Sequence, residues 1–293
     1  MAQATGKPVV FLSFANGVEH NYLQQLKKES TVLRDLFLPL HQNGDIELVR
    51  EESLEDSDLP KLMARYKDRI AIFHFAGHAS GKALNLEGGY GHAKGLAQLL
   101  SLQKELKIAF LNGCSTQGQT KPYLEAGIPV VLATTKEISD TEATFFAQQF
   151  YHALVHQHSI REAFQVATGA LRTRVFTHER RREEIVCYRG LLSRNENLEE
   201  LPWRLYYLHE KEEAILDWSL PKQPTLDVEI LIEGELQDFN DTRKEDLIAM
   251  VAAVLKIDKD SVNIKKIIEG SNIVIMELPK EKAEEWIKFF IAN

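Results

Sequence analysis

Short apolar runs alternate with longer amphipathic segments along the first half of this chain of 293 residues. The runs are rich in β-branched and aromatic residues, which is typical of buried strands, and the segments between them carry apolar residues at helical spacing. We expect strands over residues 9–14, 46–49, 70–75, 108–111 and 129–134, and helices over residues 20–40, 59–66, 96–106 and 141–156. Strands that alternate with helices form a parallel sheet covered by helices on both faces, so the sequence predicts an α/β fold.

Two of these strands lead into residues that can carry chemistry. The stretch IAIFHFAGHAS contains His78, and the stretch KIAFLNGCST contains Cys114. Ligand and catalytic residues collect at the carboxyl ends of the strands in such sheets, because the loops that leave this edge converge. If the two strands are neighbours, right-handed crossover places the His78 and Cys114 side chains at the same edge.

A cysteine and a histidine at one edge supply the parts of a cysteine peptidase. Such an enzyme needs a thiolate, a base that generates it, and backbone N–H groups that face the developing oxyanion. In this interpretation Cys114 attacks the scissile carbonyl, His78 transfers the proton, and the N–H groups of Cys114 and Ala79 hold the oxyanion. Gly77 and Gly113 let the chain turn sharply and let a substrate approach closely. The alternative is that Cys114 is a buried apolar residue and His78 a satisfied core histidine.

The composition changes near residues 219–224, SLPKQP, which contain two prolines and no apolar periodicity. This stretch is interpreted as a linker between a domain over residues 1–220 and a domain over residues 221–293. In the second domain we expect strands at 226–232, 262–268 and 273–278, a turn at 269–272, and helices at 242–255 and 280–291. These elements predict a small α+β domain. Because it contains no cysteine, histidine or glycine-rich loop, we expect an interaction module.

Charge and cysteine content narrow the functional classes. The formal charge of −8 argues against a sequence-independent nucleic-acid binder, and Arg180 to Arg182 are interpreted as a solvated helix face. Two cysteines, Cys114 and Cys187, do not make a disulfide framework. No apolar run approaches the roughly 18 residues of a membrane helix, and no charged-then-apolar leader begins the sequence. We therefore expect a cytoplasmic protein without nucleic-acid or membrane partners.

Several motifs resemble the CHAT family, a bacterial branch of the caspase-like peptidases. The resemblance covers most of residues 8–220 and is most specific in IAIFHFAGHAS around His78 and LNGCST around Cys114. VVFLSFAN, AGIPVVLATTKEISD, FFAQQFYHAL and PWRLYYLHEKEEAILDWSLP are supporting segments. The family implies a caspase-like, parallel-dominated sheet and a cysteine endopeptidase with a His78–Cys114 dyad, without metal or cofactor. Ala79 departs from the glycine that many members carry, and its Cβ is expected to narrow the cleft.

The second domain resembles adaptor domains that recruit effectors to signalling ATPases in bacterial defence against phage. The resemblance therefore implies that protein substrates are cleaved in a regulated signalling or antiphage pathway. The peptidase would stay idle until a partner, such as a signalling ATPase or another adaptor-bearing protein, engages residues 221–293 and orders the cleft.

Two other functions compete with the peptidase. One is a catalytically silent caspase-like scaffold that binds a partner protein. The other is a nucleotide-dependent signalling domain, which the absence of a phosphate-binding loop disfavours. The glycine cluster LEGGYGHAKG lacks the Gly-Lys-Ser/Thr ending of such a loop and is interpreted as a flexible loop near the cleft.

An acidic residue is a candidate for substrate selection. Related families read the P1 side chain with an acidic or basic residue on the loop that comes after the cysteine-bearing strand and the strand that follows it. The corresponding loop here is residues 135–140, where Asp140 matches the acidic position and Glu137 lies nearby. A carboxylate in a partly closed pocket favours Arg or Lys at P1. Alternatively, Asp140 caps the helix that begins at Thr141, and one residue can do both.

Two further segments contain histidines or arginines that bear on function. His152 and His156 have the spacing of metal ligands on a helix, with His158 beyond. No cysteine or paired glutamate completes a zinc site, so they are interpreted as surface histidines. Residues 177–200 are charged and poorly periodic, and we expect a mobile loop whose arginines suit self-cleavage if P1 is basic.

Overall fold

The computed structural model describes residues 6–17, 22–173, 201–208, 212–222, 224–231, 240–268 and 273–291. The chain divides into two compact units, one formed by residues 1–37 and 47–220 and the other by residues 38–46 and 221–293. The loop expected at 177–200, with its arginine cluster, lies outside the described residues. Within the ranges given above, no helix is both long and apolar enough to cross a membrane.

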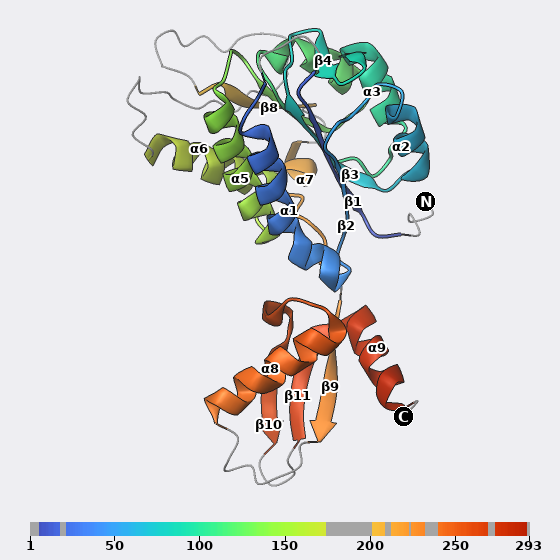
Figure 1. Ribbon diagram of the computed structural model, residues 1–293, viewed down its shortest axis with the longest axis vertical. Coiled ribbons are helices and arrows are strands. Elements are labelled where there is room, and N and C mark those ends of the chain that lie inside the picture. Colours follow the sequence, from blue (N-terminus) through green and yellow to red (C-terminus); the bar gives the residue numbers. More distant parts are fainter. Residues whose placement is uncertain are drawn as a thin grey trace. The chain divides into compact units, whose positions relative to one another are not determined.

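A six-stranded sheet forms the centre of the first unit (Figure 1). Its strands are β1 (Val9–Ala15), β2 (Glu47–Glu51), β3 (Ile70–Gly77), β6 (Ile108–Asn112), β7 (Val130–Thr134) and β8 (Trp203–Tyr207), in the order β2-β1-β3-β6-β7-β8. The first five are parallel, and β8 pairs antiparallel with β7. The predicted parallel-dominated α/β sheet is therefore confirmed. β8 was not expected from the sequence, although all five of its residues are buried.

Helices cover both faces of this sheet, as predicted. Figure 1 shows α2 (Leu59–Arg65) and α3 (Ala93–Ser101) on one side, and α1 (Leu26–Asn43), α5 (Asp140–Val155) and α6 (Ile160–Thr173) on the other. Two short helices, α4 (Thr120–Glu125) and α7 (Glu212–Leu216), also belong to this unit.

The glycine cluster does not form the flexible loop that we expected. It contributes to a hairpin of two antiparallel strands, β4 (Ala83–Leu86) and β5 (Gly89–His92). All four residues of β4 are buried, and the Asn85 N–H donates a 2.9 Å hydrogen bond to the His78 carbonyl oxygen. Burial of β4 within the first unit thus orders the glycine cluster, whose composition alone suggested mobility.

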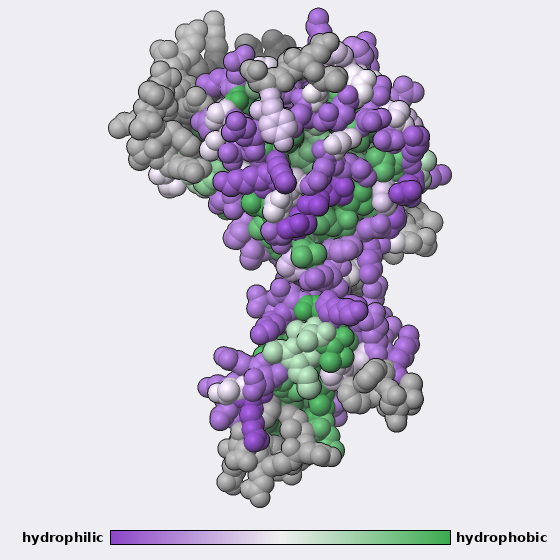
Figure 2. Space-filling model, in the orientation of Figure 1, coloured by the Kyte–Doolittle hydropathy of each residue, from purple (hydrophilic) through white to green (hydrophobic). Residues whose placement is uncertain are grey.

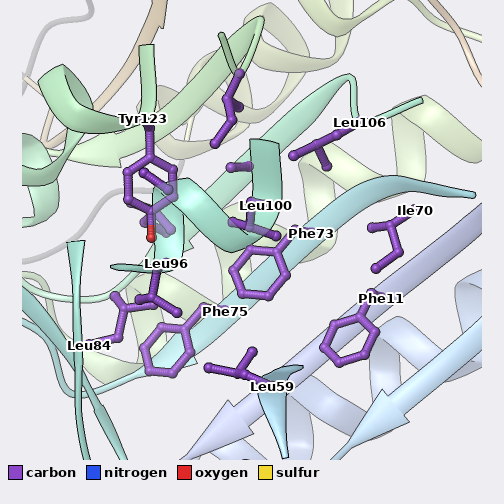
Figure 3. Packing of buried hydrophobic residues seen from close by; sticks show 14 of the residues in the cluster. Phe11, Leu59, Ile70, Phe73, Phe75, Leu84, Leu96, Leu100, Leu106 and Tyr123 are labelled. Carbon is purple, nitrogen blue, oxygen red and sulfur yellow. The ribbon is translucent and has the colours of Figure 1, made fainter. Parts of the chain in front are cut away.

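The two faces of the sheet bury different kinds of side chain, because successive strand residues point to opposite faces. Toward α2 and α3, Phe11, Phe73 and Phe75 pack in an apolar cluster with residues such as Leu59 and Leu96 (Figure 3). The Phe11 and Phe73 rings stack with their centroids 5.9 Å apart. The opposite face, toward α1 and α5, also buries polar side chains, among them Glu29, His74 and Asn112.

The second unit is a three-stranded antiparallel sheet with two helices. β9 (Thr225–Leu231), α8 (Asp241–Leu255), β10 (Asn263–Ile268), β11 (Ile273–Pro279) and α9 (Lys280–Ile291) follow one another, and the strands pair in the order β10-β11-β9. Val251, Met276, Leu278 and Trp286 belong to its own apolar core. The predicted small α+β fold is confirmed, while the turn expected at 269–272 lies outside the described residues.

Candidate active site

His78 and Cys114 follow two strands that are neighbours in the sheet. β3 pairs in parallel with β6, in a register that places Ala76 opposite Asn112. His78 and Cys114 each lie two residues beyond this last pair, so they occupy equivalent positions at the two strand ends. The expectation that the two strands are adjacent is confirmed, and the topology brings both residues to the carboxyl edge of the sheet.

Glycines bring the two loops into contact. A Cβ placed on Gly113 would lie 2.6 Å from the Ala79 Cβ and 2.7 Å from the Gly77 carbonyl oxygen. Gly77 itself has a φ of 154°, and a Cβ there would overlap the Ala15 carbonyl oxygen. Side chains other than hydrogen are therefore excluded at both positions, and the backbone before Cys114 lies directly against the backbone around the histidine.

The same two loops remain connected further along the chain. Gln119 Nε2 donates a 2.7 Å hydrogen bond to the Ser80 carbonyl oxygen. Gly118 approaches Gly81 so closely that a Cβ on Gly118 would lie 2.5 Å from the Gly81 carbonyl oxygen. The histidine-bearing and cysteine-bearing loops thus form one continuous edge.

Neither His78 nor Cys114 is buried. Cys114 is a free cysteine, and its Sγ lies 3.7 Å from the Ile138 carbonyl oxygen. The alternative in which both are buried core residues does not hold, because both side chains are partly exposed. The backbone N–H groups of Ala79 and Cys114 donate no hydrogen bond to any residue of the described ranges, so each can donate to a bound group.

Asp140 is the first residue of α5 and is not its cap. The N-cap is Ser139, whose Oγ accepts a 3.2 Å hydrogen bond from the Glu142 N–H, while the Glu142 carboxylate accepts from the Ser139 N–H. The alternative that Asp140 caps the helix is therefore wrong. The physical reason is the capping box, in which Ser139 occupies the capping position. The helix therefore starts at Asp140, one residue earlier than the predicted Thr141.

The Asp140 carboxylate is partly buried and hydrogen-bonded to the backbone before α1. Its Oδ2 accepts a 2.7 Å hydrogen bond from the Gln25 N–H. Burial raises the pKa of Asp140; the hydrogen bond from Gln25 lowers it, the charge of Glu29 raises it, and the charge of His78 lowers it.

The remaining candidates lie on exposed parts of the chain. Glu137 is exposed on the loop before α5. The His152 and His156 rings stack with their centroids 4.3 Å apart, and His158 Nδ1 lies 3.6 Å from a Glu162 carboxylate oxygen. Burial lowers the pKa of His152, as do the neighbouring histidines. Among the described residues, no three His, Cys, Asp or Glu side chains form a group that could hold a metal ion.

The structure places three residues near this edge that the sequence analysis missed. Gln25 holds Asp140, and Glu29 and Asn112 are buried behind the strand ends. Asn112 carried a signal, because it is a polar residue at the end of an apolar strand. Gln25 and Glu29 carried none, since polar residues are ordinary at the start of an amphipathic helix.

Comparison with known proteins assigns the family. A family model described as the CHAT domain matches residues 12–226. No curated protein matches the sequence. Caspase-1 from Spodoptera frugiperda is structurally similar, with 12% identity, a TM-score of 0.38, and coverage of 57% of this chain and 78% of that chain. The Drosophila initiator caspase Dronc gives 11% identity, a TM-score of 0.41, and coverage of 58% and 74%. Because the family model spans well over half of the sequence, the chain belongs to the CHAT-domain family.

Proposed function

We propose that this CHAT-domain protein is a cysteine endopeptidase in which Cys114 is the nucleophile and His78 is the general base. The observation that carries the proposal is the position of the two side chains, each partly exposed, just beyond neighbouring parallel strands. The close approach at Gly113 holds their loops together. A thiol beside an imidazole at the carboxyl edge of such a sheet is suited to nucleophilic catalysis.

The chain's own groups account for each step of peptide hydrolysis. His78 takes the proton of the Cys114 thiol, and the thiolate attacks the scissile carbonyl carbon. The free N–H groups of Ala79 and Cys114 donate to the oxyanion that forms. The protonated His78 then gives its proton to the leaving amine, which departs and leaves an acyl-enzyme. Water, deprotonated by His78, hydrolyses the thioester and restores the Cys114 thiol.

Asp140 and Glu137 are proposed to select the substrate. The loop that carries them borders the nucleophile, because the Ser115 N–H donates a 3.1 Å hydrogen bond to the Lys136 carbonyl oxygen. Asp140 is partly exposed and Glu137 is exposed, so both carboxylates can face a bound peptide. A negative charge at this position favours Arg or Lys at P1 through a charge-assisted hydrogen bond.

The second unit is proposed to recruit the peptidase to a partner protein in a bacterial signalling or antiphage pathway. Large apolar side chains are exposed on it, including Leu231 at 72%, Met250 at 51% and Val254 at 51%. Met250 and Val254 are four residues apart on α8 and share one face of that helix. Figure 2 shows apolar residues on the visible face that carries α8. Exposed apolar residues of this kind favour a protein partner, such as an adaptor-bearing signalling ATPase.

The decisive experiment compares the full-length protein with Cys114→Ala on a peptide library, with cuts identified by mass spectrometry. Cuts that disappear in the variant support the peptidase, and their P1 residues test Asp140. Labelling of Cys114 with an electrophilic probe, with and without His78→Ala, tests the dyad. If no cut occurs, even with candidate partners encoded nearby, and labelling is equally slow in both proteins, the peptidase is refuted and the silent scaffold is favoured.

A further inference from the structure

A charged side chain is buried behind the proposed catalytic residues. Glu29, on α1, exposes only 1% of its surface, and the residues around it are similarly inaccessible. We call this group the buried polar cluster; it consists of Glu29, His74, Asn112, Thr144, Tyr151 and Trp203. An ionised carboxylate is strongly disfavoured in a protein interior unless hydrogen bonds replace its hydration. The partners of Glu29 therefore deserve a functional explanation.

Both carboxylate oxygens of Glu29 have partners from elements that carry the site. Oε1 accepts a 2.8 Å hydrogen bond from Asn112 Nδ2 and lies 3.2 Å from His74 Nε2. Oε2 accepts a 3.3 Å hydrogen bond from Thr144 Oγ1 on α5. One side chain of α1 thus ties together β3, β6 and α5.

Asn112 uses the hydrogen-bonding groups of its side chain fully in this arrangement. Its Nδ2 donates to Glu29 and, at 3.2 Å, to the Ala143 carbonyl oxygen. Its Oδ1 accepts a 3.2 Å hydrogen bond from Trp203 Nε1 on β8. Asn112 is the last residue of β6 and is followed by Gly113 and then Cys114. Its side-chain amide therefore anchors the chain immediately before the turn that carries the proposed nucleophile.

The end of β6 needs such an anchor because its ladder with β7 stops early. The paired positions between these strands end at Phe110 and Leu132, two residues before Asn112. Beyond that point, Thr116 Oγ1 donates a 3.0 Å hydrogen bond to the Leu111 carbonyl oxygen, and the buried polar cluster holds Asn112. On the β7 side, side chains therefore replace the backbone ladder where the strand reaches the site, while the ladder with β3 continues to Asn112.

The histidine-bearing strand is held by the same cluster. His74 lies four residues before His78, and its Nδ1 is 3.2 Å from the Tyr151 hydroxyl. Burial raises the pKa of Tyr151, and the Glu29 charge raises it further, so the phenol keeps its proton and remains able to donate. The His74 carbonyl oxygen accepts a 2.6 Å hydrogen bond from Ser13 Oγ on β1.

We propose that Glu29 and Asn112 are positioning residues, which fix the end of β6 and thereby the orientation of Cys114 relative to His78. This inference rests on the proposed peptidase function. Neither residue reaches the substrate, and both act through the backbone of Gly113 and Cys114. A buried network in which every member is satisfied specifies one geometry, whereas an apolar filling of the same volume would leave the strand end free to shift.

The test uses the full-length protein with Cys187→Ser as background, so that Cys114 is the only thiol. Glu29→Ala removes the partner of His74 Nε2 and leaves Asn112 Nδ2 with the Ala143 carbonyl oxygen as its remaining acceptor. We expect kcat to fall about 10²-fold with KM little changed, the effect of a misplacement of about 1 Å. Glu29→Gln keeps an acceptor toward Asn112 and a donor toward Thr144, and we expect it to restore kcat to within a few-fold of the background protein.

Two further variants separate positioning from general loss of stability. Leu100→Ala opens a cavity in the apolar cluster on the other face of the sheet, where Leu100 is 1% exposed, and should lower the Tm without lowering kcat per folded molecule. Trp203→Phe removes the donor to Asn112 together with part of the buried indole, and keeps a ring to stack on Phe146, whose ring centroid lies 4.5 Å from that of Trp203. It should fold and lose kcat several-fold.

A readout that does not need substrate keeps the two proposals distinguishable. Iodoacetamide alkylation of Cys114 should slow about tenfold in Glu29→Ala, recover in Glu29→Gln, and stay unchanged in Leu100→Ala. If the background protein cleaves nothing while alkylation follows this pattern, the peptidase fails and the positioning role survives. The positioning role is overturned if Glu29→Ala and Trp203→Phe keep the kcat and the Cys114 alkylation rate of the background protein. It is also overturned if they change no more than Leu100→Ala does.

Discussion

Substituting alanine for Gly113 should weaken both the fold and the catalysis, because the added Cβ meets two atoms that cannot move cheaply. It would lie 2.6 Å from the Ala79 Cβ and 2.7 Å from the Gly77 carbonyl oxygen, well inside the roughly 3.5–4.0 Å of an ordinary carbon contact. Overpacking of this kind costs about 1–3 kcal/mol. Each kcal/mol lowers the Tm of a unit of this size by about 2–4 °C, so we expect a loss of about 2–12 °C.

The same clash should separate the catalytic loops. A displacement of Cys114 by about 1 Å corresponds to roughly a 10²-fold loss of kcat. Thermal denaturation and Cys114-dependent peptide cleavage measure the two effects. Gly169→Ala in α6 is the matched control, because a Cβ there has no neighbour within 4 Å. Alanine in place of glycine inside a helix stabilises by about 0.5–1 kcal/mol, so the control should raise the Tm.

A second substitution tests the contact itself. Ala79→Gly removes one of the two clashing atoms and leaves the Gly77 carbonyl oxygen in place. The double variant Gly113→Ala with Ala79→Gly should therefore regain part of the lost Tm and kcat, which a double-mutant cycle measures. A single variant with the Tm and kcat of the original protein, or a double variant no better than the single one, would refute the steric argument.

Four further predictions concern Ser139, Asp140 and the core of the second unit. Ser139→Ala removes the capping box of α5 and should cost about 1 kcal/mol, measured by urea denaturation; an unchanged midpoint contradicts the cap. Asp140→Asn should lower cleavage after Arg and Lys about 10–160-fold, from the 1.5–3 kcal/mol of a charged hydrogen bond. Burial raises the pKa of Asp140 in the folded protein, so the folded state binds the proton more tightly than the unfolded state does. Ionisation of Asp140 therefore destabilises the fold as the pH rises above the ordinary pKa of an aspartate. The free energy of unfolding of Asp140→Asn, minus that of the original protein, should therefore be larger at pH 7 than at pH 3. Equal differences at the two pH values would contradict this prediction. Met276→Ala, at a fully buried position, should cost about 2–5 kcal/mol and expose the second unit to proteolysis, whereas Met250→Ala, at an exposed position, should not.

The strands that carry the site were predictable because burial on both faces demands nearly continuous apolar residues. All eight residues of β3 and all five of β6 are buried, and their runs stood out in the sequence. β8 escaped prediction because it lies far along the chain from the alternating pattern, although it is as long as β6 and β7. The β4–β5 hairpin was misread because its glycines suggested mobility, whereas burial of Leu84 and Leu86 decides its structure.

The sequence by itself determined which residues end the strands. A buried run followed by a glycine and then His78 or Cys114 is a local pattern, and the chain can satisfy it only by turning at the strand end. The family motifs and the order of elements are also local, so they could be read without knowing which segments meet.

Only the tertiary structure decided which partners these residues have. The acceptor for the Gln25 N–H is Asp140, 115 residues away, and the donor to the buried Glu29 carboxylate is Asn112, 83 residues away. Periodicity records which face of an element is buried but not what it is buried against, because packing chooses among all segments of complementary shape. The cluster behind Cys114 therefore became visible only once the helices were placed on the sheet.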